Sequence, residues 1–157
     1  MAHWVRFDRA GVTAFGTLDG STIAVHRGDM FAGSTPTGET VAVSAVRLLA
    51  PCQPSKLIAL WNNFHGLAAK LGQASPPEPL FFIKAASCYA GPGDTLHRPA
   101  GYEGKVVYEG ELGIVIGATC RNASAADAEA AVFGYTCIND LTASDILNKD
   151  PTFAQWT

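Results

Sequence analysis

The sequence has little charge and no long apolar run. Only 16% of its 157 residues are charged, and the formal net charge is −3. The chain therefore lacks the basic patch that neutralises nucleic-acid phosphates, and we expect no nucleic-acid partner. It also has no apolar run of about 18 residues, the length that spans a bilayer, and its N-terminus does not resemble a signal peptide. We expect a cytoplasmic protein with no membrane contact.

Clustered metal-binding cysteines are also missing. The cysteines form no Cys-x-x-Cys pair, and no histidine stands at zinc-finger spacing from them. This dispersal argues against a structural zinc site and against a redox motif. We expect reduced thiols, most of them buried, at Cys52, Cys88, Cys120 and Cys137. Any metal site in this chain would then use oxygen ligands.

The hydrophobic content, 48%, is enough for a real core. Short β-type runs and turn residues predict a mostly β protein with short helices (α+β). We place a small N-terminal β domain at residues 1–54, ending near two prolines, and a second part at residues 55–157. In the first part, the dipeptide Asp19-Gly20 predicts a type I′ hairpin turn, and Gly33–Glu39 is expected to be turn-rich. Meander strands are expected at Trp4–Phe7, Val12–Leu18 and Thr22–His26.

The second part alternates predicted strands with short helices. Leu57–Trp61 reads as a short buried strand and Leu80–Lys84 as another strand. A helix over Asn63–Leu71 should stop at Gly72. Further predicted features are a helix over Asn122–Ala131 capped by Ser124, a strand over Ala131–Ile138 that ends at Asn139-Asp140, and a last helix capped by Thr142 and Asp145.

Two carboxylates lie one residue apart in the β-rich run Val106–Gly117. Side chains alternate along a strand, so Glu109 and Glu111 point to the same face, with Cα atoms roughly 7 Å apart. Such a pair is often only the solvated face of an antiparallel ribbon. Here the rest of that face is apolar or glycine, and two close carboxylates repel unless a metal ion or a proton lies between them. The residues alone leave both interpretations open.

Several short motifs follow one another over about residues 55–157. They are Phe81-Phe82-Ile83-Lys84, Gly91-Pro92-Gly93-Asp94, Tyr108-Glu109-Gly110-Glu111-Leu112, Ile114-Val115-Ile116-Gly117, Gly134-Tyr135-Thr136, Asn139-Asp140 and Gln155-Trp156-Thr157. Together they resemble the fumarylacetoacetate hydrolase family. Their order and spacing carry the resemblance. It implies that residues 55–157 form the first part of the mixed β-roll of that family.

The resemblance also implies a site and an activity. In that family the residues matching Glu109, Glu111 and Asp140 hold Mg²⁺ or Mn²⁺, and carboxylate oxygens suit both cations. Lys84 matches an active-site lysine that would position the substrate or stabilise developing negative charge. The implied reaction acts on a dicarbonyl or 2-keto acid through a metal-bound enolate, by C–C bond hydrolysis, decarboxylation or isomerisation. The resemblance further implies a homodimer.

The lid helix departs from the family pattern. Family members usually carry Asn-Tyr-x-x-His-x-x-Glu, whose His and Glu activate water, whereas Leu67 and Lys70 occupy those two positions here. His65 lies two residues away, about 200° around a helix, and is either an alternative base or a surface or capping histidine. Ser144 and Leu147 stand where the hydrolases have Arg and Gln. A reaction that needs no lid-activated water, such as isomerisation, therefore gains weight.

The length departs from the family pattern as well. Family catalytic domains continue beyond the Gln-Trp-Thr motif, whereas this chain ends at Thr157. We expect either a fragment or a fold completed by a second chain, since strands of the roll would otherwise have open apolar edges. The alternative to an enzyme is a non-catalytic metal- or ligand-binding fragment that lacks the lid His–Glu pair and the C-terminal half.

Overall fold

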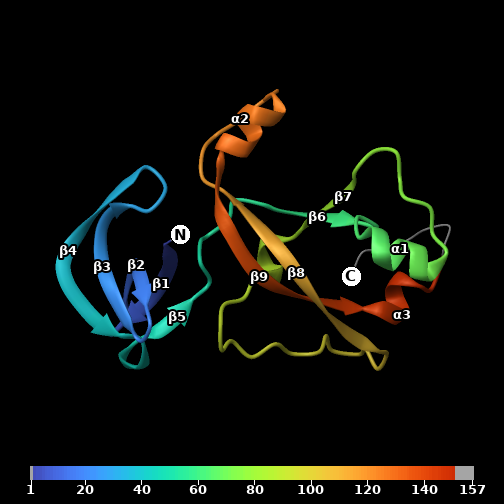
Figure 1. Ribbon diagram of the computed structural model, residues 1–157. Helices are drawn as coiled ribbons and strands as arrows, with labels where there is room; N and C mark the ends of the chain where they lie inside the picture. The colour runs from blue at the N-terminus through green and yellow to red at the C-terminus, as the bar shows by residue number, and fades with distance from the viewer. Residues whose placement is uncertain (1, 151–157) are drawn as a thin grey trace. The chain divides into compact units, whose positions relative to one another are not determined.

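A computed structural model describes residues 2–150, which form mostly β-strands with a few short helices, as predicted (Figure 1). The chain groups into two compact units, one made of Met1–Cys52 with Gly91–Thr157 and the other of Gln53–Ala90. The domain boundary after residue 54 stays a prediction. The Gln155-Trp156-Thr157 motif lies outside the described residues. Within residues 2–150, no helix combines the length and apolarity needed to cross a bilayer.

The N-terminal sheet has five antiparallel strands in the order β4-β3-β2-β1-β5. The predicted meander is confirmed as β1, β2 and β3. The prediction that Gly33–Glu39 is turn-rich was wrong, because these residues belong to a long strand in which residues 33–36 pair with β3. Strand bounds are β1 His3–Arg9, β2 Val12–Asp19, β3 Thr22–Asp29, β4 Gly33–Ala42 and β5 Arg47–Leu49, with a 3-10 turn at Val43–Ala45.

The two hairpin turns of the meander differ from each other. Asp19 pairs with Thr22, so the central residues of that turn are Gly20 and Ser21, and only Gly20 has positive φ. The type I′ turn predicted at Asp19-Gly20 is therefore wrong, although the hairpin itself is present. The turn between β1 and β2 has positive φ at both central residues, Ala10 (52°) and Gly11 (85°), as a type I′ turn requires.

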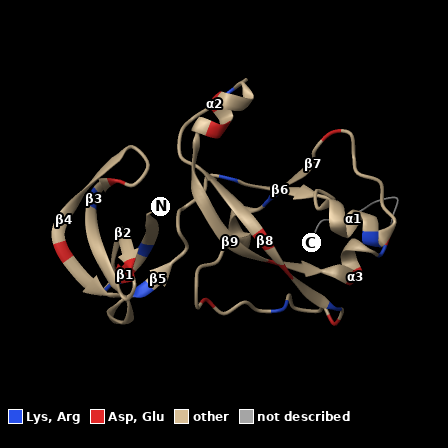
Figure 2. Ribbon diagram, in the orientation of Figure 1, with Lys and Arg blue, Asp and Glu red and all other residues tan. Residues whose placement is uncertain are grey.

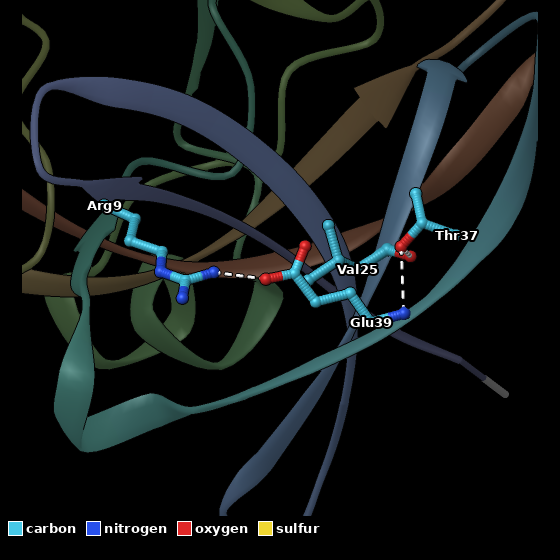
Figure 3. A network of polar contacts seen from close by, with 4 residues as sticks. All are labelled: Arg9, Val25, Thr37 and Glu39. Carbon is cyan, nitrogen blue, oxygen red and sulfur yellow. Dashed lines mark hydrogen bonds and ion pairs between the residues drawn. The ribbon is translucent and has the colours of Figure 1, made fainter.

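A polar network holds the irregular pairing of β3 with β4. The register shifts between Ala24 and His26, which leaves Val25 outside the regular ladder. The Thr37 hydroxyl donates a hydrogen bond to the Val25 carbonyl at 3.0 Å and accepts one from the Glu39 amide at 3.1 Å (Figure 3). The Glu39 carboxylate also forms an ion pair with Arg9. Because both ends of this pair are half exposed, we attribute the local order mainly to the threonine.

The core of the described residues lies in the N-terminal sheet. Phe7 is 1% exposed and Ile23 is fully buried, and they cluster with Val41. Partly buried side chains from β1, β2, β3 and the turn after β4 pack around them. Aromatic contacts extend from this sheet to the second sheet of the same unit, since the rings of Trp4 and Phe31 lie 6.1 Å and 4.8 Å from the ring of Phe133.

The unit formed by Gln53–Ala90 contains one hairpin, one α-helix and a short 3-10 helix. Strands β6 (Leu57–Trp61) and β7 (Leu80–Lys84) pair antiparallel, with the bounds that the sequence predicts. Helix α1 (His65–Leu71) ends at Gly72, whose left-handed conformation confirms the predicted stop. The expectation that Leu57–Trp61 is buried was wrong, since Ile58 and Leu60 are exposed in the described residues. A short 3-10 helix follows at Ala86–Cys88.

A long antiparallel ribbon, β8 (Val106–Ile116) with β9 (Val132–Ala143), completes the first unit. Helix α2 (Ala125–Ala130) lies in the connection at one end and α3 (Ser144–Leu147) follows the other end (Figure 1). Ser124 caps α2 by accepting a hydrogen bond from the Asp127 amide, as predicted. One face of the ribbon is an exposed apolar stripe, a surface of the kind that promotes association. This stripe contains Val106, Tyr108, Leu112, Ile114, Ile116, Tyr135 and Leu141.

Candidate metal centre

Three carboxylates meet on the face of the ribbon opposite its apolar stripe. Glu109 and Glu111 are the charged residues of β8, and Asp140 is the charged residue of β9 (Figure 2). Glu109 pairs directly with Asp140 across the ladder, and Glu111 pairs with Ile138. One carboxylate oxygen from each residue lies within 4.8 Å of the other two. The predicted same-face arrangement of the two glutamates is therefore present.

Asp140 reaches the cluster because β9 is longer than predicted. The sequence suggests that the strand stops at Asn139-Asp140, but the ladder continues to Ala143, paired with Val106. That prediction was wrong because a polar dipeptide can stay extended when the partner strand supplies its hydrogen bonds. As a result, Asp140 lies inside the ladder, with paired residues both before and after it along β9, instead of lying in a turn.

The donor set fits a hard divalent cation. Carboxylate oxygens are the ligands that Mg²⁺ and Mn²⁺ prefer. Glu111 and Asp140 are half buried and Glu109 is exposed, so the cluster combines partial shielding with an opening to solvent. Three negative charges this close repel one another, and a dication between them would reverse the sign of that interaction. Three protein ligands would also leave coordination positions for water and substrate.

Lys84 and His65 belong to the other compact unit, Gln53–Ala90. Lys84 is the last residue of β7, and its Nζ atom lies 5.4 Å from the centroid of the Phe82 ring. His65 is the first residue of α1, and its Nδ1 atom lies 3.2 Å from the Ser75 hydroxyl. Their predicted catalytic and substrate-binding roles stay predictions.

The lid positions carry side chains that cannot activate water. Leu67 is 54% exposed on α1, and Lys70 lies in the last turn of the same helix. A leucine has no ionisable group, and an ammonium group has no lone pair with which to accept a proton. Helix α1 therefore presents no His–Glu pair at these two positions.

A polar clasp closes the open end of the ribbon, and the sequence did not reveal it. We call Tyr102, Gly104, Lys105, Ser144 and Asp145 the clasp. The Asp145 carboxylate accepts a hydrogen bond from the Lys105 amide at 3.1 Å, and the Asp145 amide donates to the Tyr102 hydroxyl at 3.2 Å. The prediction that Thr142 and Asp145 cap the last helix was wrong, because α3 follows Ala143 and has no side-chain cap. The partner of Asp145 lies 40 residues away in the sequence, beyond the reach of local patterns.

The cysteines are more accessible than expected. Cys88, Cys120 and Cys137 are exposed and Cys52 is partly buried, all four as free thiols. The expectation that most are buried was wrong, because the small core lies in the N-terminal sheet, which contains none of them. Burial raises the pKa of the Cys52 thiol, and the nearby Arg6 guanidinium offsets part of that effect.

Comparison with known proteins decides the family. Residues 56–157 match the family described as fumarylacetoacetate (FAA) hydrolase C-terminal, and residues 2–51 match one described as Rv2993c-like, N-terminal. The chain belongs to the fumarylacetoacetate hydrolase family. This assignment confirms the resemblance drawn from the motifs and the mostly β fold expected from it, and it places the chain in a family of enzymes.

Relatives within the fumarylacetoacetate hydrolase family include isomerases and decarboxylases. The chain is 35% identical to oxaloacetate tautomerase YisK of Bacillus subtilis over 71% of its own length and 38% of that protein. It is 43% identical to the homoprotocatechuate catabolism bifunctional isomerase/decarboxylase of Escherichia coli, over 59% of the chain and 22% of that protein. The crystal structure of 2-hydroxyhepta-2,4-diene-1,7-dioate isomerase from Mycobacterium marinum matches with 30% identity and a TM-score of 0.83, over 100% of the chain and 60% of that structure.

Coverage of these relatives is partial. The chain spans about half the length of curated relatives that it matches, with shares of 46%, 56% and 43% in three of them.

Proposed function

We propose that this chain carries the Mg²⁺ or Mn²⁺ site of an enzyme that isomerises a 2-keto acid or related dicarbonyl compound, with decarboxylation or C–C bond hydrolysis as related outcomes. The observation that carries the proposal is the convergence of Glu109, Glu111 and Asp140, whose oxygens lie within 4.8 Å of one another. The names of two relatives, an oxaloacetate tautomerase and a 2-hydroxyhepta-2,4-diene-1,7-dioate isomerase, support the substrate class.

Keto–enol isomerisation suits the residues of this chain. It moves one proton between the carbon beside the carbonyl and the carbonyl oxygen, and it consumes no water. Glu109, Glu111 and Asp140 would hold the cation, which when bound supplies a Lewis acid for the substrate oxygens. The Lys84 ammonium group would bind the substrate carboxylate or the oxygen that gains negative charge. Leu67 and Lys70 at the lid positions are compatible with a reaction that needs no activated water.

Replacing Lys84 by Met should lower the rate of oxaloacetate tautomerisation by about 100-fold, the usual cost of losing one electrostatic donor. Because Lys84 is not among the three carboxylates, Mn²⁺ affinity should not change. The rate is measured from the decay of enol absorbance with Mg²⁺ or Mn²⁺ present, and affinity is measured by calorimetry. Lys56→Met is the matched control, since Lys56 is an exposed lysine of the same unit.

Two results would count against this proposal. Activity that survives EDTA would show that the reaction does not need the metal. Full activity in Lys84→Met would show that it does not need the lysine. The non-catalytic alternative, which the lid substitutions favour, expects tight Mn²⁺ binding with no turnover of any keto acid tested. EDTA-sensitive turnover would contradict that alternative.

The homodimer implied by the family resemblance stays a prediction. Light scattering on the purified protein tests it directly, because a dimer has twice the mass of the 16.5 kDa chain.

A further inference from the structure

We infer that the clasp sets the pairing register of β8 and β9, and that Tyr102 and Asp145 are thereby positioning residues for the carboxylate cluster. The inference rests on the proposed metal site for its functional meaning. The claim about register stands on the geometry of the ribbon alone.

The connection between the two strands does not set the register by itself. In a tight hairpin, loop length and turn type determine which residues pair. Here β8 ends at Ile116 and β9 begins at Val132, so the intervening segment contains helix α2 and no tight turn. The ladder is also irregular at that end, with a register shift between Val115 and Ile116.

The side chains of β8 specify the register weakly. Gly110 and Gly113 interrupt the strand and carry no side chain of their own, although Ile138 and Thr136 of β9 pack over Gly113. The apolar stripe on one face is exposed, so burial does not penalise a shifted pairing there. Strands of this kind are prone to slippage.

The clasp lies directly beyond the last pair of the ladder, Val106 with Ala143. Three donors converge on the Lys105 carbonyl oxygen: the Ser144 amide at 3.0 Å, the Ser144 hydroxyl at 3.1 Å and the Tyr102 hydroxyl at 2.7 Å. The Lys105 amide donates to the Asp145 carboxylate at 3.1 Å. Both backbone polar groups of Lys105 thus bond to residues that follow β9, and these bonds form only when Ala143 lies opposite Val106.

The carboxylate cluster depends on this register. A slip of one residue turns the side chain of Asp140 to the other face of the ribbon. A slip of two residues moves it roughly 7 Å along the strand. Either change separates Asp140 from its direct partner Glu109.

Gly104 offers a way to disturb the clasp without removing a polar group. A Cβ atom at this position would lie 2.6 Å from the Tyr102 hydroxyl oxygen and 2.7 Å from Oδ2 of Asp145. Gly104→Ala should therefore push these two side chains apart.

The test compares Mn²⁺ affinity, measured by electron paramagnetic resonance, among clasp variants of the protein. Tyr102→Phe, Asp145→Ala and Gly104→Ala should weaken binding by on the order of tenfold, because the apparent affinity falls with the fraction of molecules in the binding-competent register. Asp145→Asn keeps an acceptor for the Lys105 amide and should largely restore affinity. Glu129→Ala, which removes an exposed acid of α2, should change nothing.

A second readout reports the register without metal. Cross-strand nuclear Overhauser effects in metal-free protein should join Glu109 to Asp140 and Tyr108 to Leu141 in the wild type. These effects should weaken in the clasp variants, while those between β1 and β2 remain and show that the variants still fold.

The two readouts separate the possible failures. The role of the clasp would be overturned if Asp145→Ala and Gly104→Ala both bind Mn²⁺ as tightly as the wild type and show the same cross-strand nuclear Overhauser effects. If the wild type does not bind Mn²⁺, the proposed function fails, and the cross-strand effects alone then decide whether the clasp sets the register.

Discussion

Replacing Glu109 by Gln or Asp140 by Asn should lower Mn²⁺ affinity by about 100-fold or more. Even residues that only support a metal ligand typically contribute 10- to 100-fold, and these substitutions exchange a charged ligand for a neutral amide of the same shape. Calorimetric titration measures the loss, and circular dichroism checks that the strands remain. The fold should persist, because Glu109 is exposed and its backbone pairing with Asp140 does not depend on the carboxylate.

Although these substitutions weaken metal binding, they should stabilise the protein when no metal is present. Removing one of three neighbouring negative charges relieves repulsion, so Glu109→Gln should melt at a higher temperature than the wild type in EDTA. Glu129→Gln on α2 is the control, since it makes the same chemical change outside the cluster. Unchanged Mn²⁺ affinity in both Glu109→Gln and Asp140→Asn would refute the candidate centre.

Phe7→Ala should destabilise the N-terminal sheet by about 3–5 kcal/mol, the usual cost of truncating a buried phenylalanine. Phe7 is 1% exposed and contributes one of the two largest fully buried side chains in the described residues. Because domains are typically stable by only about 5–15 kcal/mol, the loss should lower the urea midpoint strongly. Intrinsic tryptophan fluorescence, to which Trp4 of β1 contributes, follows the transition.

Phe81→Ala provides the contrast in side-chain burial. Phe81 is 67% exposed on β7, and substitutions at such surfaces usually change stability by about 0.5 kcal/mol or less. Equal shifts of the urea midpoint in the two variants would show that the cluster around Phe7 is not the core that its burial indicates.

Local patterns were enough to locate most strands and helix ends. Short apolar runs predicted β6 and β7 with their observed bounds. Capping chemistry located the start of α2 at Ser124 and the end of α1 at Gly72. These features depend on residues within a few positions of each other, which is the range over which backbone propensity and capping act.

Features that depend on a distant partner were not predictable in this way. Gly33–Glu39 is polar, yet it belongs to β4, because β3 pairs with residues 33–36 and again from Thr40 onward. Ile58 and Leu60 are apolar, yet they are exposed, because burial requires another surface and not only an apolar sequence. Asp145 binds the amide of Lys105 instead of capping its own helix.

The candidate centre was half predictable. Strand periodicity alone places Glu109 and Glu111 on one face. Nothing local in the sequence indicates that Asp140 lies opposite Glu109, because register between strands joined by a long connection has no short-range signature. Asp140 was assigned to the predicted site only because it matches the family motif. The clasp residues were not assigned to it.

The long separation of the ribbon strands has a consequence for the order of folding. Arg9 pairs with Val12 across a short turn, whereas Val106 pairs with Ala143. Closing a longer loop costs more chain entropy, and nonlocal pairing is slower. We therefore expect β1–β3 to form early and the ribbon late, so that newly made protein has no carboxylate cluster until its last folding step. Pulse-labelled hydrogen exchange should protect β1–β3 amides before those of β8 and β9, and the reverse order would contradict this sequence of events.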